Sequence, residues 1–291
     1  MREKSFGIIG GDMRQAALAE SISGDGNIAY ACFLEKAPLS DSVKKAGLEE
    51  TALRCGYIVL PLPAVAGGKY LKADLSYGKI LLDDGFAEKL QGKKIFCGMA
   101  EKLKATSRLW ENNEIYDYSE SEEFKIGNAL LTAEGALGTA MREFGGTVHG
   151  SRCLVAGFGR IGKTLAYMLR GIGADVAVSA RKRTDLSWIK TYGYRPVPAG
   201  SMCAAGRYDI IFNTVPEVIF DKGTLGALDK NTLIIDLASP PGGVDMEAAR
   251  ECKIKTVAAL SLPGKTAPEA AGEIIKNIIY NIINETSVRG K

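Results

Sequence analysis

The chain has 291 residues, of which 46% are hydrophobic and 24% are charged, and its formal net charge is +3. These values are typical of a globular protein with room for two domains, and they exclude a disordered or fibrous chain. The positive charge is too small and too evenly spread to favour nucleic-acid binding, since no basic run is longer than Arg181-Lys182-Arg183.

The six cysteines form no Cys-x-x-Cys pair, and several lie in apolar segments, so we expect buried, reduced thiols. The single histidine, His149, leaves no His/Cys cluster with metal-ligand spacing, and we expect no metal site. No apolar signal segment opens the chain, and no run of about 18 apolar residues occurs in it. These features predict a cytoplasmic protein without a membrane span.

Short apolar runs alternate with helical patterns through the first part of the chain, which is typical of a parallel α/β sheet. The runs predict strands at Phe6–Ile9, Ile28–Leu34, Tyr57–Leu62, Lys94–Cys97 and Ile115–Tyr118. No repeat of about 20 to 50 residues is present, which excludes a solenoid or propeller. We expect residues 1–131 to form an N-terminal α/β domain on the substrate side.

The first predicted strand ends at Gly10-Gly11, and Asp12 and Arg14 follow it, ahead of a helix predicted to begin around Ala16. Asp12 could simply cap this helix. It also lies at the carboxyl end of a strand, facing the expected interdomain cleft, where Arg14 would suit a carboxylate substrate. The sequence leaves both interpretations open.

A bridge helix is predicted to begin after Thr132 and to stop at Gly145-Gly146. Thr132 is the expected N-cap. Glu134, beside the expected cleft, could act as an acid or a base. We expect residues 132–265 to contain this helix and a second α/β domain.

The rest of the chain again alternates strand and helix, with strands predicted at Arg152–Ala156, Asp175–Ala180, Ile210–Asn213, Leu233–Asp236 and Lys255–Ala258. A last helix is expected within residues 266–291, where isoleucines recur at the i, i+4 spacing of one helix face. They are Ile274, Ile275, Ile278, Ile279, Ile282 and Ile283. This stripe is expected to pack back across the first domain or to form a dimer seam. The fold class is therefore α/β, with two doubly wound parallel-sheet domains, the second a Rossmann fold.

A strand, a Gly-x-Gly-x-x-Gly loop and a helix follow one another from residue 152 onward. Gly157 permits the tight turn, Gly159 lets the backbone approach a pyrophosphate, and Gly162 lets the helix pack close to the strand. The helix N-terminus presents amide donors to the phosphates. The intervening residues Phe158, Arg160 and Ile161 complete this predicted cofactor loop.

NAD-selective Rossmann domains usually place a carboxylate at the end of the second strand. Here that position holds Ser179-Ala180, followed by Arg181 and Lys182. A serine hydroxyl and a guanidinium can bind a 2′-phosphate, which a carboxylate would repel. The sequence therefore predicts that the Rossmann domain within residues 132–265 binds NADP(H), although a solvated basic turn would look the same.

Two later strand ends should flank the ribose and the nicotinamide, because ligands bind at the carboxyl ends of parallel strands. The first loop is Asn213-Thr214-Val215-Pro216, and the second begins with Asp236-Leu237-Ala238-Ser239. Asn, Pro and Gly are also ordinary loop residues.

The segment that opens the last helix, Leu262-Pro263-Gly264-Lys265, lies where hydroxy-acid dehydrogenases commonly carry a catalytic histidine. No histidine is available, since His149 is expected in a surface turn at the opposite end of the sheet. Lys265 could instead bind a substrate carboxylate or relay a proton.

Several of these motifs, in this order, resemble the family of dipicolinate synthase A subunits over nearly the whole chain. The more specific ones are Gly10-Gly11-Asp12-x-Arg14 and Leu262-Pro263-Gly264-Lys265. The resemblance implies NADP-dependent oxidation of a dihydrodipicolinate-type precursor to pyridine-2,6-dicarboxylate. It also implies that the precursor comes from a branch of the lysine/diaminopimelate pathway and that the product is made during sporulation. It also implies that a flavoprotein-like B subunit is the partner, and we expect a homo-oligomer as well.

In this interpretation Arg14 and Lys265 bind the dicarboxylate, and Asp12 or Glu134 receives the proton. Two alternatives remain. One is another NADP-dependent dehydrogenase of shikimate or methylene-tetrahydrofolate type. The other is a non-catalytic NADP-binding subunit whose partner performs the chemistry.

Overall fold

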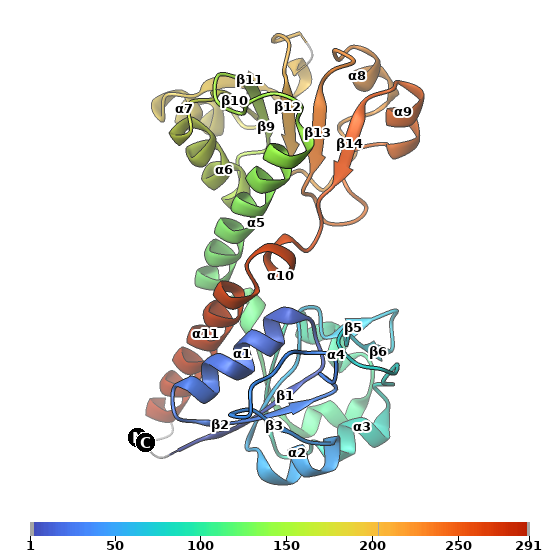
Figure 1. The fold of residues 1–291 in the computed structure, drawn as a ribbon, viewed down its shortest axis with the longest axis vertical. Coiled ribbons are helices and arrows are strands. Elements are labelled where there is room, and N and C mark those ends of the chain that lie inside the picture. The colour runs from blue at the N-terminus through green and yellow to red at the C-terminus, as the bar shows by residue number, and fades with distance from the viewer. Residues whose placement is uncertain (1–2, 203, 290–291) are drawn as a thin grey trace. The chain divides into compact units, whose positions relative to one another are not determined.

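The computed structural model describes residues 3–202 and 204–289, and the chain divides into two compact units (Figure 1). Unit 1 combines the chain up to Asn128 with the chain from Pro263 onward, and unit 2 is Ala129–Leu262. The boundary at Asn128 falls inside a single helix, α5 (Glu122–Glu143).

Unit 1 is built on a six-stranded sheet in which all neighbouring strands are parallel, in the order β3-β2-β1-β4-β7-β8. The strands are β1 (Ser5–Ile9), β2 (Ile28–Cys32), β3 (Lys44–Lys45), β4 (Tyr57–Val59), β7 (Lys94–Cys97) and β8 (Glu114–Asp117). A small antiparallel pair, β5 (Val65–Ala66) and β6 (Tyr70–Leu71), follows β4.

Helices cover both faces of this sheet (Figure 1). The helices of this unit are α1 (Met13–Gly24), α2 (Leu48–Arg54), α3 (Asp84–Lys89), α4 (Ala100–Lys104), η1 (Arg108–Asn112), η2 (Tyr118–Glu120), the start of α5, α10 (Leu262–Thr266), whose first residue belongs to unit 2, and α11 (Pro268–Arg289). Successive strand residues point to opposite faces, so Phe6 and Ile8 pack with α1 and α11, whereas Ile9 packs with α2 and α3.

The C-terminal helix α11 packs on unit 1 through its isoleucine stripe, as the sequence predicts. Ile275, Ile278, Ile279 and Ile283 are buried in the same core cluster as β1 and α1. The two helices meet closely at Gly272, where a Cβ would lie 2.7 Å from the backbone nitrogen of Leu18. The stripe is therefore part of the unit 1 core.

Unit 2 has the strand order β11-β10-β9-β12-β13-β14, and again all neighbouring strands are parallel. Its strands are β9 (Arg152–Ala156), β10 (Asp175–Ala180), β11 (Arg195–Pro198), β12 (Ile210–Asn213), β13 (Leu233–Asp236) and β14 (Lys255–Ala258). Its helices beyond α5 are α6 (Arg160–Gly171), α7 (Arg183–Thr191), η3 (Ala199–Ser201), α8 (Lys222–Gly226) and α9 (Met246–Glu251).

Both main sheets have the 3-2-1-4-5-6 order of a doubly wound Rossmann sheet when strands are numbered within each sheet. The predicted fold class is therefore confirmed. In such sheets ligands bind outside the carboxyl ends of strands 1 and 4, where the winding direction reverses. This rule directs attention to β1 and β4 in unit 1, and to β9 and β12 in unit 2.

Two helix starts differ from the prediction. Helix α5 begins at Glu122, so Thr132 is a buried residue within the helix and is not its N-cap. Helix α1 begins at Met13 rather than around Ala16, because Asp12 caps it by accepting a hydrogen bond from the Arg14 amide.

The thiols of Cys32, Cys55, Cys97 and Cys153 are free and buried, as predicted, and Cys252 is free and half-buried. Burial raises the pKa of Cys32 to about 12, which makes it an unreactive thiol. Cys203 lies outside the described residues. Within residues 3–202 and 204–289, no helix has the length and apolar character needed to cross a bilayer, and no three His, Cys, Asp or Glu side chains form a metal-binding group.

Candidate functional site

The loop after β9 requires glycine at two positions. Gly157 has φ +104°, and a Cβ there would lie 2.3 Å from the Oγ1 of Thr214. A Cβ on Gly162 would lie 2.2 Å from the carbonyl oxygen of Gly157, so only glycine lets α6 approach the strand this closely. Both observations agree with the roles predicted from the sequence.

Gly159 differs from these two glycines because a Cβ there would meet no heavy atom within 4 Å. It forms the N-cap of α6 and provides no side-chain hydrogen bond to the first amides of the helix. The loop therefore leaves open space beside backbone donors at the positive end of a helix dipole, and this arrangement fits a pyrophosphate.

A pocket of about 350 Å³ adjoins this loop. Ten of the predicted cofactor residues line it: Gly157, Phe158, Gly159, Ser179, Ala180, Arg181, Lys182, Thr214, Val215 and Pro216. Four further lining residues escaped sequence reasoning, namely Asp185, Ala199, Glu217 and Ile219. The pocket thus spans the carboxyl ends of β9, β10 and β12, where the fold predicts a ligand.

The other predicted cofactor residues do not line this pocket. Arg160, Ile161 and Gly162 lie in the first turn of α6, whereas Asp236 ends β13 and Leu237–Ser239 follow it. Asn213 and Asp236 are buried, at 0% and 4% exposure, and bind each other through Asn213 Nδ2 and Asp236 Oδ1 at 2.8 Å. Their side chains hold the loops in place rather than facing the pocket.

Asp236 is the centre of this loop-holding network. Its Oδ1 also accepts from the amide of Ala238 at 3.1 Å, and its Oδ2 accepts from the amide of Gly243 at 3.0 Å. Asn213 in turn binds Val215 twice, donating to its carbonyl oxygen at 3.0 Å and accepting from its amide at 3.1 Å. These hydrogen bonds to Asn213 and Asp236 therefore hold the loop that carries Thr214 and Val215 in place.

The end of β10 provides cations to the pocket. Ser179 is 2% exposed, and its carbonyl oxygen accepts from the Gly157 amide at 3.0 Å. Arg181 and Lys182 come next and are exposed. The Nη1 of Arg181 lies 3.3 Å from the Oε2 of Glu217.

In unit 1 the corresponding strand ends carry an ion pair. Arg14 donates from Nε to Asp12 Oδ1 at 2.9 Å and from Nη2 to Asp12 Oδ2 at 2.8 Å. Its Nη2 also donates to the carbonyl oxygen of Leu62 at 2.9 Å. Arg14 therefore joins the segment after β1 to the segment after β4, at the position where this sheet reverses its winding.

Burial, Arg14 and Lys72 together set the pKa of Asp12. Burial raises the pKa of Asp12, but hydrogen bonding to Arg14 and attraction to its charge outweigh burial, so the pKa of Asp12 lies below its usual value. The charge of Lys72, which sequence reasoning missed, lowers it further. Asp12 is thus a carboxylate at neutral pH. A general base works best when its pKa lies near the working pH, and the lowered pKa of Asp12 makes it a weak base.

The segment that opens α10 passes over this ion pair. A Cβ on Gly264 would lie 3.1 Å from Asp12 Oδ2 and 3.2 Å from Arg14 Nε. The two sequence motifs singled out as most specific therefore meet in space, although about 250 positions separate them. Lys265 follows Gly264 and is exposed.

Comparison with known proteins gives matches over both units. Residues 5–116 match the family model of the dipicolinate synthase A-subunit N-terminal domain, and residues 124–244 match "D-isomer specific 2-hydroxyacid dehydrogenase, NAD binding domain". The dipicolinate synthase A subunit of Bacillus subtilis (strain 168) is 28% identical over 96% of this chain and 95% of its own length. The chain is thus similar to dipicolinate synthase A subunits along almost its whole length.

Two solved structures from this family extend the result to the fold. The A subunit of Bacillus subtilis dipicolinate synthase has a TM-score of 0.84 with 27% identity, covering 99% of this chain and 98% of that one. The A subunit of dipicolinate synthase from Bacillus halodurans has a TM-score of 0.83 with 26% identity, covering 96% and 97%. Unit 2 is thus a nicotinamide-dinucleotide-binding domain of a dehydrogenase type.

The remaining predicted site residues do not line the unit 2 pocket. Glu134 is exposed on the unit 2 part of α5, whereas Asp12, Arg14 and Lys265 belong to unit 1. His149 lies in an exposed turn before β9, as predicted, and its ring packs beside Gly173.

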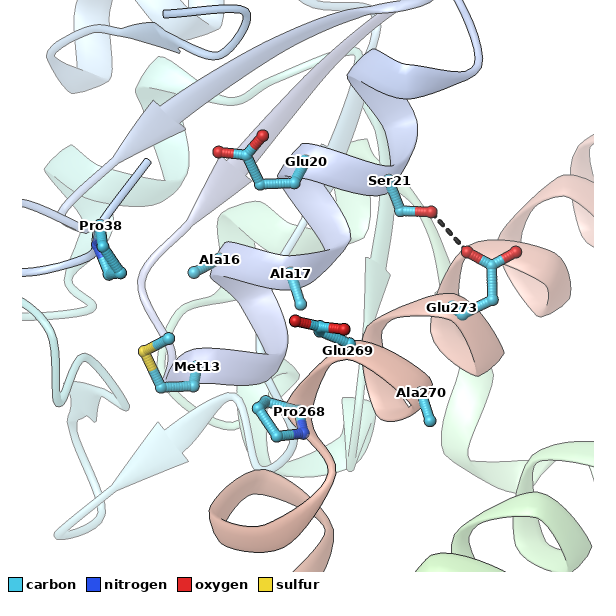
Figure 2. Close-up of a pocket in the computed structure, with 10 residues that line it drawn as sticks. All are labelled: Met13, Ala16, Ala17, Glu20, Ser21, Pro38, Pro268, Glu269, Ala270 and Glu273. Carbon is cyan, nitrogen blue, oxygen red and sulfur yellow. Dashed lines mark hydrogen bonds between the residues drawn. The ribbon is translucent and has the colours of Figure 1, made fainter. Parts of the chain in front are cut away.

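A larger cavity of about 580 Å³ lies between α1 and α11 in unit 1 (Figure 2). Three carboxylates line it, on Glu20, Glu269 and Glu273, and none of the described residues that line it is a cation. Lys276 lies behind this lining and pairs with Glu273 at 3.0 Å. Glu273 accepts a hydrogen bond from the Ser21 hydroxyl, drawn as a dashed line. Glu20 and Glu269 leave the lining acidic, so this cavity is a poor site for a dicarboxylate.

Proposed function

We propose that this chain is the A subunit of a dipicolinate synthase and uses NADP(H) to oxidise a dihydrodipicolinate-type precursor to pyridine-2,6-dicarboxylate. In this proposal residues 1–131 form the substrate side, residues 132–265 bind the dinucleotide, and residues 266–291 return to the first domain. The observation that carries the proposal is the open glycine loop of unit 2 in a chain that matches the A subunits along almost its whole length.

The dinucleotide would be held by the unit 2 pocket. The amides at the start of α6 would bind the pyrophosphate, and Gly159 leaves room for it. Arg181 and Lys182 support NADP(H), because they provide positive charge where NAD-selective domains have a carboxylate. When bound, the nicotinamide supplies the two-electron acceptor for the oxidation.

The substrate is expected to lie at the strand ends of unit 1. A dicarboxylate needs cations, and Arg14 and Lys265 are the candidates, with Lys72 as a third cation near Asp12. Arg14 already shares its Nε and Nη2 with Asp12, so it would bind substrate as part of a pair. Such contacts would orient the ring for transfer, which is the main demand of a reaction that gains an aromatic product.

The oxidation balances with few protein groups. The dihydropyridine ring loses two electrons and two hydrogens, one with the electron pair to the dinucleotide and one as a proton. Asp12 or Glu134 is the proposed proton acceptor. The lowered pKa of Asp12 favours Glu134 for this role.

The proposal includes a second type of subunit, because the relatives are designated A subunits. We propose that a flavoprotein-like B subunit is the partner, and that the A subunits also form a homo-oligomer. A non-catalytic role for the A subunit is a second candidate, and the same designation is consistent with it.

The proposal is tested by mixing the purified full chain with NADP⁺ and freshly generated dihydrodipicolinate, and following NADPH absorbance and dipicolinate by chromatography. Equal amounts of both products from the chain alone support the proposed reaction. Products that arise only after the B subunit is added support the non-catalytic candidate. If neither mixture forms dipicolinate, the proposed function is wrong.

Lys265→Ala is expected to lower kcat/KM about tenfold without changing the Kd for NADP⁺, because it removes one charged contact to a carboxylate. Lys265 is exposed, so the variant should fold normally. Lys102→Ala removes an equally exposed cation from α4 and serves as the control. Equal kcat/KM values for wild type and Lys265→Ala would remove Lys265 from the substrate site.

A further inference from the structure

The pocket beside the glycine loop contains charges of both signs at the position expected for the adenosine ribose. Arg181 and Lys182 provide two cations, and Asp185 and Glu217 provide two carboxylates. NADP(H) and NAD(H) make opposite demands here, since a 2′-phosphate needs cations whereas a 2′-hydroxyl needs a carboxylate acceptor. The cations alone therefore do not define the preference.

Glu217 is the carboxylate in direct contact with a cation of this pocket. Its Oε2 lies 3.3 Å from Arg181 Nη1, and the two side chains are 64% and 76% exposed. Exposed ion pairs of this kind contribute little free energy, so a ligand can separate the two groups at small cost. The guanidinium and the carboxylate are thus both available to a ribose substituent.

The backbone on both sides of Glu217 is anchored. On the N-terminal side, Val215 exchanges two hydrogen bonds with the buried side chain of Asn213. On the C-terminal side, the amides of Ile219 and Phe220 both donate to the carbonyl oxygen of Gly243 at 3.1 Å. These hydrogen bonds hold the backbone beside Glu217, which keeps this residue at the edge of the pocket.

We propose that Glu217 sets the relative affinity of this site for NADP(H) and NAD(H). With NAD(H), its carboxylate accepts from the 2′-hydroxyl and replaces the acceptor that is missing after β10. With NADP(H), it repels the 2′-phosphate and competes with it for Arg181. This inference rests on the proposed dinucleotide site, and it makes the site a dual-specificity site in which Arg181 favours one cofactor and Glu217 the other.

The test is isothermal titration of the full chain and its Glu217→Gln variant with NADP⁺ and, separately, with NAD⁺. Glutamine keeps the shape and removes the charge. The Kd for NADP⁺ should fall about fivefold, as expected for the loss of about 1 kcal/mol of repulsion between charges about 4 Å apart in a water-like medium. The Kd for NAD⁺ should rise about fivefold, because the 2′-hydroxyl exchanges a charged acceptor for a neutral one. The ratio of the two constants should then change about 25-fold.

Glu251→Gln is the matched control, because Glu251 forms an exposed pair with Lys222 at 2.7 Å in the same unit and does not line the pocket. It should leave both constants unchanged. If wild type binds NADP⁺ but Glu217→Gln shifts both dinucleotides equally or neither, the inference fails while the proposed function stands. If wild type binds neither dinucleotide, both fail.

Discussion

Arg181→Asp should raise the Kd for NADP⁺ at least about 100-fold while changing the Kd for NAD⁺ by no more than about threefold. The substitution removes a guanidinium from the 2′-phosphate, which costs about 1.5–3 kcal/mol for a charged hydrogen-bonded contact. It also adds a carboxylate beside a group of charge about −2, in a pocket that already holds Glu217. NAD⁺ has a neutral hydroxyl at this position, so neither effect weakens its binding. Titration of the full chain with both dinucleotides measures the two constants.

Arg183→Asp is the control for this experiment. Arg183 has the same charge and begins α7, but it does not line the pocket, so its reversal should change both constants only slightly. An equal loss of NADP⁺ and NAD⁺ binding in Arg181→Asp would contradict a contact with the 2′-phosphate. It would instead indicate general damage to the loop after β10.

Much of unit 2 was predictable because its sheet is parallel. Strands buried on both faces appear in the sequence as continuous apolar runs, and β9, β10, β12 and β13 have the predicted bounds. The edge strand β14 also has the predicted bounds, although its residues are exposed or half-buried. β11 escaped prediction because Pro196 and Pro198 argue against a strand. Both are tolerated because β11 lies at the sheet edge.

Helix α5 shows how a tertiary contact can hide a helix start. Gly127 lies inside its first half, where glycine weakens a helical pattern. A Cβ at this position would lie 2.9 Å from Ile274 Cδ1, so glycine serves the packing of α5 against α11. The sequence shows the glycine but not the neighbour, which is why the pattern points wrongly to Thr132 as the N-cap.

The candidate site was predictable where one segment carries it. Gly157–Gly162 follow β9 directly and Ser179–Lys182 span the end of β10, so the local pattern predicts their place. Glu217 lies 36 positions from Arg181 and Lys72 lies 60 positions from Asp12. Only the parallel sheet brings such partners together at one edge, and no spacing rule in the sequence points to them.

Asn213 and Asp236 were predicted to face the cofactor, but their side chains have another role in the structure. Polar residues at strand ends suggest a ligand, yet here they hydrogen-bond the protein itself. Buried polar groups that hold loops have the same residue types and positions as groups that bind cofactors. Burial distinguishes the two, and burial of a single side chain is not visible in the sequence.

Asp236→Ala is therefore expected to act on stability first, lowering the free energy of unfolding by about 3 kcal/mol. It removes an acceptor of three hydrogen bonds and leaves Asn213 Nδ2 and the amides of Ala238 and Gly243 without their carboxylate. Because this network fixes the loop at Thr214, affinity for the dinucleotide should fall as well. Urea unfolding of the full chain gives the free energy, and hydrogen exchange should increase in both loops.

Asp175→Ala provides the comparison, because Asp175 is exposed at the start of β10 in the same unit. Surface substitutions of this kind usually change stability by less than about 0.5 kcal/mol. Asp236→Asn separates charge from shape, since an amide oxygen can still accept from one or two of the three donors. A loss of cofactor affinity in Asp236→Ala with unchanged unfolding and unchanged loop exchange would contradict the loop-holding role. It would mean that Asp236 contacts the ligand directly, as its position at a strand end suggests.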